Sequence, residues 1–162
     1  MKELWLYRHA KTEKAGFGID DKLRKLLPEG EKAAAYVGGE LARYKHVPEL
    51  VFTSSSERAH ATALLATQAM GFKGSIEVMP WLYNAEVNDI IKLLTNKSED
   101  RIMIVGHNPC VEECLERFGG TYERMRPGTC AWLSFGIENW SDLSARVLAN
   151  EIHLYRPKES GL

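Results

Sequence analysis

Three short segments of this 162-residue chain carry side chains of the types that bind or attack phosphate groups. Arg8 and His9 follow one apolar run of the sequence. Arg58 comes shortly after a second apolar run, and His107 comes shortly after a third. Guanidinium groups keep their charge near neutral pH and offer paired donors that match phosphate oxygens. Imidazole can attack phosphorus or donate a hydrogen bond to a phosphoryl oxygen, so the four residues indicate a phosphoryl site if the fold brings them together.

Short apolar runs that alternate with helical-period stretches define the elements that would position these residues. The run from Ile102 to Val105 is apolar throughout, which is typical of a central strand covered on both faces. Strands that alternate with helices favour an α/β fold of three layers, with a mostly parallel central sheet flanked by helices. The predicted strands are Leu4–Tyr7, Leu50–Thr53, Ile102–Val105, Ala131–Phe135 and Val147–Leu154.

Four stretches between these runs are predicted as helices. Apolar residues at positions i, i+3, i+4 and i+7 line one helix face, and residues 87–94 and 111–118 both show this spacing. A further helix is expected to start near Pro28 and continue past Leu41. Ser54 lies three residues before Glu57, a capping-box spacing that predicts a helix running toward Met70.

The position of the candidate residues relative to the strands is the main argument for a shared site. Ligands of parallel sheets bind beyond the carboxyl ends of the strands, where the helices begin. The segments after Tyr7, Thr53 and Val105 would therefore meet at one edge of the sheet, and helices starting near Arg58 and Pro109 would direct their positive ends there. Each segment alone also fits surface decoration or a simple turn, so it is their coincidence that favours a site.

Composition and charge exclude several classes of protein. Hydrophobic residues make up 44% and charged residues 27% of the sequence, which predicts a single globular domain over residues 1–162. A net charge of −1 argues against a nucleic-acid binder or a polybasic membrane-docking protein. No apolar run approaches a membrane span, and the N-terminal run is short for a signal peptide. Three cysteines suit free thiols in a reducing compartment, so we expect a soluble, cytoplasmic protein.

The sequence resembles a known family at several points. Arg8-His9-Ala10, followed by Thr12, resembles the Arg-His-Gly signature of the histidine phosphatase superfamily, whose fold is phosphoglycerate mutase-like. The similarity extends over almost the whole chain and is greatest to the short branch, the SixA-type phosphohistidine phosphatases. Further segments match in the same order: Leu23–Leu26 with Gly30, Ser54–Thr62, Leu82–Ala85, Val105–Pro109 and Pro127–Thr129.

Three positions depart from the family pattern. Ala10 stands where glycine is usual, which is tolerated only if the turn there needs no positive φ. Lys25 and Ser55 each replace a usual proline, which affects local rigidity more than chemistry. None of the three substitutions removes a charged member of the predicted site.

The resemblance implies a mechanism. His9 would be the nucleophile and would form a phosphohistidine intermediate that water hydrolyses. Arg8, Arg58 and His107 would bind the phosphoryl oxygens and stabilise the charge spread over them in the transition state. His9 must then be neutral, with its second nitrogen held by a backbone acceptor. Because side chains supply the positive charge, we expect no metal and no other cofactor.

The choice of substrate depends on whether the site carries an acid for the leaving group. Larger family members protonate an alkoxide leaving group, and Glu86 is the candidate here, although an acidic residue in the first turn of a helix also simply favours the helix dipole. A phosphohistidine can lose its imidazole already protonated. This favours a phosphohistidine-bearing protein as the partner, with a small-molecule phosphomonoesterase as the alternative. Thr12 and Asn108 are further candidates for substrate contact.

One interpretation from a different class is a structural zinc module. His107, Cys110 and Cys114 have the spacing H-x2-C-x3-C, and Cys130 could complete four ligands. Cys114 also belongs to an apolar helix face with Val111, however, where a buried thiol acts as a small hydrophobic group. The paired cysteine knuckle of many zinc sites is missing, which disfavours zinc.

Overall fold

A six-stranded sheet runs through the middle of the protein in the order β3-β2-β4-β1-β5-β6. The computed structural model describes residues 1–16 and 18–157. Only β5 runs antiparallel to its neighbours, so the predicted mostly parallel sheet is confirmed. The strands are β1 (Lys2–Arg8), β2 (Leu50–Thr53), β3 (Ser75–Val78), β4 (Arg101–Gly106), β5 (Cys130–Phe135) and β6 (Glu151–Tyr155).

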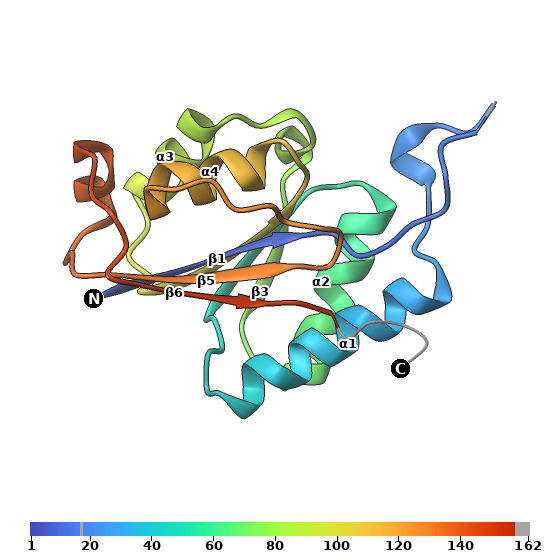
Figure 1. The fold of residues 1–162 in the computed structure, drawn as a ribbon, viewed down its shortest axis with the longest axis horizontal. Coiled ribbons are helices and arrows are strands. Elements are labelled where there is room, and N and C mark those ends of the chain that lie inside the picture. The colour runs from blue at the N-terminus through green and yellow to red at the C-terminus, as the bar shows by residue number, and fades with distance from the viewer. Residues whose placement is uncertain (17, 158–162) are drawn as a thin grey trace.

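Four α-helices cover the two faces of this sheet, which confirms the three-layer α/β fold. In Figure 1, α3 and α4 lie above the sheet, and α1 and α2 lie below it. None of the described helices is long and apolar enough to cross a membrane. The helices are α1 (Pro28–Arg43), α2 (Glu57–Met70), α3 (Val87–Thr95) and α4 (Cys110–Gly119), with short 3-10 helices η1 (Asp21–Leu23), η2 (Pro80–Asn84) and η3 (Trp140–Ala145).

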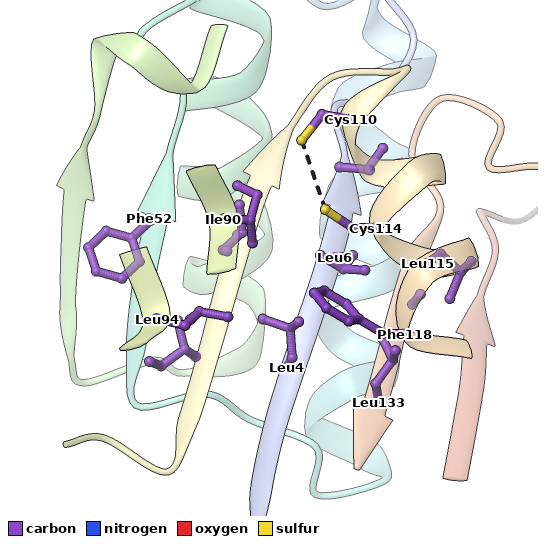
Figure 2. Packing of buried hydrophobic residues seen from close by; sticks show 14 of the residues in the cluster. Leu4, Leu6, Phe52, Ile90, Leu94, Cys110, Cys114, Leu115, Phe118 and Leu133 are labelled. Carbon is purple, nitrogen blue, oxygen red and sulfur yellow. Dashed lines mark hydrogen bonds between the residues drawn. The ribbon is translucent and has the colours of Figure 1, made fainter. Parts of the chain in front are cut away.

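Alternate side chains of β1 divide the core into two clusters, because successive residues of a strand point to opposite faces. Leu4 and Leu6 pack in the cluster formed with α3 and α4, which Figure 2 shows from close by. Trp5 and Tyr7 pack in the cluster formed with α1 and α2. All four side chains are at most 1% exposed, so β1 is fixed on both faces, and so is the backbone that leads directly to His9.

Two strands differ from the prediction. β3 was not predicted, because it lies at the edge of the sheet and its mostly exposed residues show no apolar alternation. The predicted strand from Val147 is wrong in its first half, since β6 begins only at Glu151. Arg146 has a positive φ of 58°, and the N–H of Ala149 donates to the carbonyl of Phe118. The backbone of Ala149 therefore bonds to the end of α4 rather than to a neighbouring strand, and pairing in the sheet starts later.

The start of α2 also corrects a prediction. The helix begins at Glu57, and its N-cap is Ser56, whose hydroxyl accepts a hydrogen bond from the N–H of Ala59 at 3.3 Å. Ser54 is not the cap, because its own N–H donates to the carbonyl of Val105 and so extends the sheet by one residue. The hydroxyl oxygen of Ser54 instead accepts a hydrogen bond from the N–H of Ser56 at 3.3 Å and lies 2.9 Å from Nε2 of His107.

The contact between α1 and α2 depends on one glycine. A methyl group added at Gly38 would lie 2.2 Å from the carbonyl oxygen of Ala66 in α2, whereas one added at Gly39 would meet nothing within 4 Å. We expect Gly38→Ala to destabilise the protein by about 1–3 kcal/mol through overpacking. Gly39→Ala should instead stabilise it by up to about 1 kcal/mol, because alanine is the better helix former. Chemical denaturation of both variants measures the difference, and equal effects would contradict the close contact.

Candidate active site

His9 directly follows β1 and lies with its ring almost fully buried, at 7% exposure. Its backbone N–H donates to the carbonyl of Gly106 at the end of β4, at 3.1 Å. Its Nδ1 lies 2.8 Å from the carbonyl oxygen of Ala10. A carbonyl can only accept, so the proton sits on Nδ1 and the lone pair of Nε2 is free. Burial lowers the pKa of His9 to about 3, so the ring is neutral near neutral pH.

His107 lies beside His9, as the sequence predicts, with a distance of 5.2 Å between the two ring centroids. It follows β4 and precedes α4, and it is 8% exposed. Its Nε2 lies 2.9 Å from the hydroxyl oxygen of Ser54 and 3.3 Å from that of Ser56. Burial, followed by the charge of Arg58, lowers the pKa of His107 to about 4. Both histidines are therefore neutral near pH 7 in the unliganded protein.

Arg58 is in the first turn of α2 and is held by Asp21 of η1. Its Nη1 donates to the backbone carbonyl of Asp21 at 2.6 Å, and its Nη2 donates to the carboxylate at 2.8 Å. The hydroxyl of Tyr83 donates to the same carboxylate. These hydrogen bonds, that of Tyr83 first, hold the pKa of Asp21 well below its usual range. Asp21 is thus an ionised anchor that fixes the orientation of the guanidinium of Arg58.

Arg8 is held from the opposite side by the segment before β5. Its Nη1 donates to the backbone carbonyl of Met125 at 3.0 Å, and Nδ2 of Asn108 donates to the same oxygen at 3.2 Å. Burial is the main cause that lowers the pKa of Arg8; the negative charge of Glu112 opposes this shift, and the positive charges of Arg124 and Arg58 add to it. The guanidinium of Arg8 is therefore fixed by the segment before β5.

Both guanidinium groups keep a donor that no protein group satisfies. Within the described residues, Nε of Arg8 and Nε of Arg58 are buried and have no hydrogen-bond partner. Buried N–H groups are rarely left unpaired in native proteins. A tetrahedral oxyanion would supply acceptors for both groups and would compensate their charge. The arrangement therefore suits a phosphoryl group placed next to the neutral ring of His9.

The remaining predicted residues lie in other hydrogen-bond systems. Glu86 is exposed and is the N-cap of α3, where it forms a capping box with Asp89. The sequence predicted Glu86 in the first turn of this helix, whereas the structure places it one residue before the helix begins. The hydroxyl of Thr12 donates to the carbonyl of Glu13 and accepts from Arg24. Among the described residues, no hydrogen bond or ion pair joins Glu86 or Thr12 to the two histidines. A role for either residue stays a prediction.

Sequence reasoning missed the residues that support this constellation. Thr62 accepts a hydrogen bond from the N–H of Ala10 at 2.9 Å and donates to the carbonyl of Arg58 at 2.7 Å. Thr62 and Tyr83 belong to segments that match the family pattern, which could have marked them. Asp21 lies in an irregular charged stretch where neither spacing nor hydropathy distinguishes it. Ala10 does not adopt a positive φ, so the turn tolerates its methyl group.

The alternative of a zinc module, which the sequence disfavours, does not fit the structure, because the sheet separates Cys130 from Cys110 and Cys114. Cys110 and Cys114 lie on the buried face of α4 (Figure 2), and their sulfur atoms are 4.0 Å apart. Cys130 packs in the cluster on the other face of the sheet. Over residues 1–16 and 18–157, no group of three or more His, Cys, Asp or Glu side chains is arranged to hold a metal ion.

Comparison with protein families agrees with this geometry. Residues 4–90 match the family model described as the histidine phosphatase superfamily, branch 1. The match covers more than half of the chain, so the protein belongs to the histidine phosphatase superfamily. Phosphatases are accordingly the class of enzyme that its fold and site define. A search of curated proteins finds no match to the chain.

Solved structures share the fold over most of the chain. A candidate phosphohistidine phosphatase SixA from Nakamurella multipartitia is 24% identical, with a TM-score of 0.80 and coverage of 98% of this chain and 97% of that one. A candidate SixA from Agrobacterium tumefaciens is 26% identical, with a TM-score of 0.76 and coverage of 82% and 90%. A candidate α-ribazole-5′-phosphate phosphatase from Escherichia coli is 16% identical, with a TM-score of 0.68 and coverage of 98% of both chains.

The lowered pKa values of His9 and His107 predict how the protein responds to acid. Both rings stay neutral down to about pH 4–5, because their folded pKa values are about 3 and about 4. Unfolded histidine titrates near about 6.5, so between these values the unfolded state binds more protons. The free energy of unfolding should therefore fall as the pH is lowered from about 7 toward 4.

Nuclear magnetic resonance of histidine-labelled protein provides the direct measurement. His9→Gln and His107→Gln assign the two signals by their disappearance. Each variant should also weaken the dependence of stability on pH, because it removes one of the groups that resist protonation. A titration midpoint near pH 6.5 for either ring would contradict the burial described above.

Proposed function

We propose that this protein is a phosphatase that removes phosphate from phosphohistidine on a protein, through a covalent intermediate on His9. The observation that carries the proposal is the state of His9, whose proton is held on Nδ1 by the carbonyl of Ala10 at 2.8 Å. The free Nε2 belongs to a ring that lies near two guanidinium groups with unpartnered N–H donors. Nucleophile and charge stabilisers are thus present together.

The first step is transfer of the phosphoryl group to the enzyme. The lone pair of Nε2 of His9 forms a bond to phosphorus while the bond from phosphorus to the leaving group breaks. Negative charge on the three phosphoryl oxygens is stabilised by Arg8, Arg58 and His107. In the second step, a water oxygen attacks phosphorus, the bond to Nε2 breaks, and inorganic phosphate leaves with His9 neutral again. The hydrogen bond from Nδ1 to Ala10 persists throughout.

The leaving group explains why phosphohistidine is the favoured substrate. An imidazole that leaves already protonated needs no acid from the enzyme. Within the described residues, neither histidine of the site forms a hydrogen bond or ion pair with a carboxylate, and Glu86 is exposed in the capping box of α3. The arrangement therefore serves a phosphoramidate better than an alkyl phosphate ester.

A small-molecule phosphomonoesterase is the second candidate function. The Escherichia coli structure that shares the fold is described as acting on α-ribazole-5′-phosphate, which is a phosphate ester. For this chain, an ester substrate would require an acid for the alkoxide leaving group, and Glu86 would have to reach that oxygen. The two functions thus differ in what they demand of Glu86.

A panel of substrates assayed in the presence of EDTA tests the proposed function. We expect the kcat/KM for a phosphohistidine peptide to exceed the values for phosphoserine, phosphotyrosine and small phosphate esters by at least about tenfold, or about 1.4 kcal/mol. A preference for one of the esters would instead support the phosphomonoesterase.

Trapping of the intermediate tests the role of His9 in the same reaction. After brief incubation with labelled substrate and an alkaline quench, label should be bound to the protein and should be lost in mild acid. His9→Ala should bind no label, whereas His60→Ala in α2 is the matched control and should label normally. Arg58→Ala should label about 10²–10³-fold more slowly, because it lacks one charge stabiliser. Label found on His107 would show that the nucleophile is misassigned.

Whether Glu86 acts as a general acid can be tested separately. Glu86→Gln keeps the shape of the side chain and removes its acidity, so hydrolysis of phosphohistidine should change by less than about tenfold. Asp89→Asn disturbs the same capping box and controls for effects on α3 alone. A loss of several hundredfold with Glu86→Gln, but not with Asp89→Asn, would make Glu86 the general acid.

A further inference from the structure

Three more arginines lie at the same end of the sheet as the active site, beyond the carboxyl ends of the parallel strands. Arg124 and Arg126 belong to the segment before β5, and Arg156 follows β6. Together with Thr129 and Pro157 they line a cavity of about 140 Å³. All three arginine side chains are exposed. The mechanism described above uses none of them.

The pairing of the strands places this cavity beside the catalytic histidine. Tyr7 of β1 pairs with Cys130 of β5, and Cys130 pairs in turn with Tyr155 of β6. Arg8 follows Tyr7 in β1, and Arg156 follows Tyr155, the last residue of β6. The two arginines therefore lie at the same end of the sheet, where the parallel strands end, with β5 between their strands. Because neighbouring strands lie about 4.8 Å apart, the backbones of these two residues are about 10 Å apart.

The segment that carries Arg124 and Arg126 also forms part of the active-site wall. The N–H of Gly128 donates to the carbonyl of His9 at 2.8 Å, and the carbonyl of Met125 accepts from Nη1 of Arg8 at 3.0 Å. Met125 itself is fully buried, while the arginine on each side of it is exposed. The cavity is therefore attached rigidly to the residues that would bind the phosphoryl group.

The charge of the three arginines is not compensated within the part of the chain that the structure describes. None of them forms an ion pair with a residue of that part. The carboxylate of Glu112 instead accepts hydrogen bonds from the N–H of Met125 and the hydroxyl of Tyr122. Arg124 lies close enough to Arg8 for its charge to affect that guanidinium. An anion in the cavity would relieve the mutual repulsion of these groups.

We propose that Arg124, Arg126 and Arg156 form a second anion site beside the active site, which binds an acidic side chain that lies near the phosphohistidine of the phosphorylated protein. The proposal rests on the function proposed above and adds a preference among protein substrates. A cavity of about 140 Å³ is large enough for a carboxylate group. Exposed like charges at the rim of a site act mainly by steering and orienting an oppositely charged partner.

Two phosphohistidine peptides provide the test. They have the same sequence, except that Asp and Glu near the phosphohistidine in one are Asn and Gln in the other. For the unmodified enzyme at low salt, the kcat/KM for the acidic peptide should be on the order of tenfold higher, and the preference should shrink as salt screens the charges. The triple variant Arg124→Gln, Arg126→Gln, Arg156→Gln should lose the preference, while its activity on the neutral peptide and on phosphoramidate changes less than about twofold.

A second triple variant controls for the loss of positive charge in general. It combines substitutions of three exposed residues near the C-terminal ends of α1, α2 and α3: Arg43→Gln, Lys73→Gln and Lys92→Gln. These residues lie toward the end of the sheet where the parallel strands begin, away from the active site. This variant should keep the full preference for the acidic peptide. Loss of the preference in both triple variants would show a non-specific effect of net charge and would overturn the second site.

The remaining outcomes separate the two proposals. If the unmodified enzyme hydrolyses both peptides equally well, the second anion site is wrong and the proposed function stands. If it hydrolyses neither peptide but does hydrolyse small phosphate esters, the proposed function is wrong, and the second site falls with it. If the arginine variant loses activity on a bisphosphorylated small molecule but keeps the full preference for the acidic peptide, the cavity binds a second phosphate group, and the proposed binding of an acidic side chain is wrong.

Discussion

The hydrogen bond from Nδ1 of His9 to the carbonyl of Ala10 is the interaction on which the rest of the site depends. It decides which ring nitrogen carries the proton and therefore which one can attack phosphorus. The surrounding contacts keep the short turn after β1 in place. The N–H of Ala10 donates to the hydroxyl of Thr62, which in turn donates to the carbonyl of Arg58. These two hydrogen bonds connect the turn that carries His9 with the first turn of α2. The ring of His9 and the guanidinium of Arg58 are therefore held at fixed positions relative to each other.

The electrostatics of the site serve two requirements that oppose each other. A phosphoryl group needs positive charge around it, whereas a nucleophilic histidine must stay neutral. Burial and neighbouring positive charge lower the pKa of His9 and of His107, so the cluster meets both requirements. Asp21 accepts hydrogen bonds from both Nη atoms of Arg58 and so fixes the orientation of that guanidinium. The Nε atom of Arg58 then remains as a donor for the ligand. The same carboxylate accepts from Tyr83, whose ring lies edge-on to His107.

The topology of the sheet places the proposed second anion site next to the catalytic residues. β6 runs parallel to β1 although β5 between them runs antiparallel, so residues after β6 reach the edge that carries His9. Arg156 is brought there by this topology, while Arg124 and Arg126 are placed by the segment that also holds Arg8. The residues that would bind the phosphoryl group and those proposed to bind an acidic neighbour thus share one rigid support.

From the sequence alone we could predict five of the strands, the four helices between them and the four residues that converge, because the carboxyl ends of parallel strands lie at the same end of the sheet. Arg8, His9, Arg58 and His107 each follow a strand that hydropathy marks clearly. The sequence could not determine partners that depend on long-range packing. Asp21 lies 37 positions before Arg58, with α1 and β2 between them, and only the packing of the chain brings the two side chains together. The face on which Cys130 packs depends on strand register, and this is why the zinc hypothesis failed. β3 gave no signal, since an edge strand with mostly exposed side chains needs no apolar pattern.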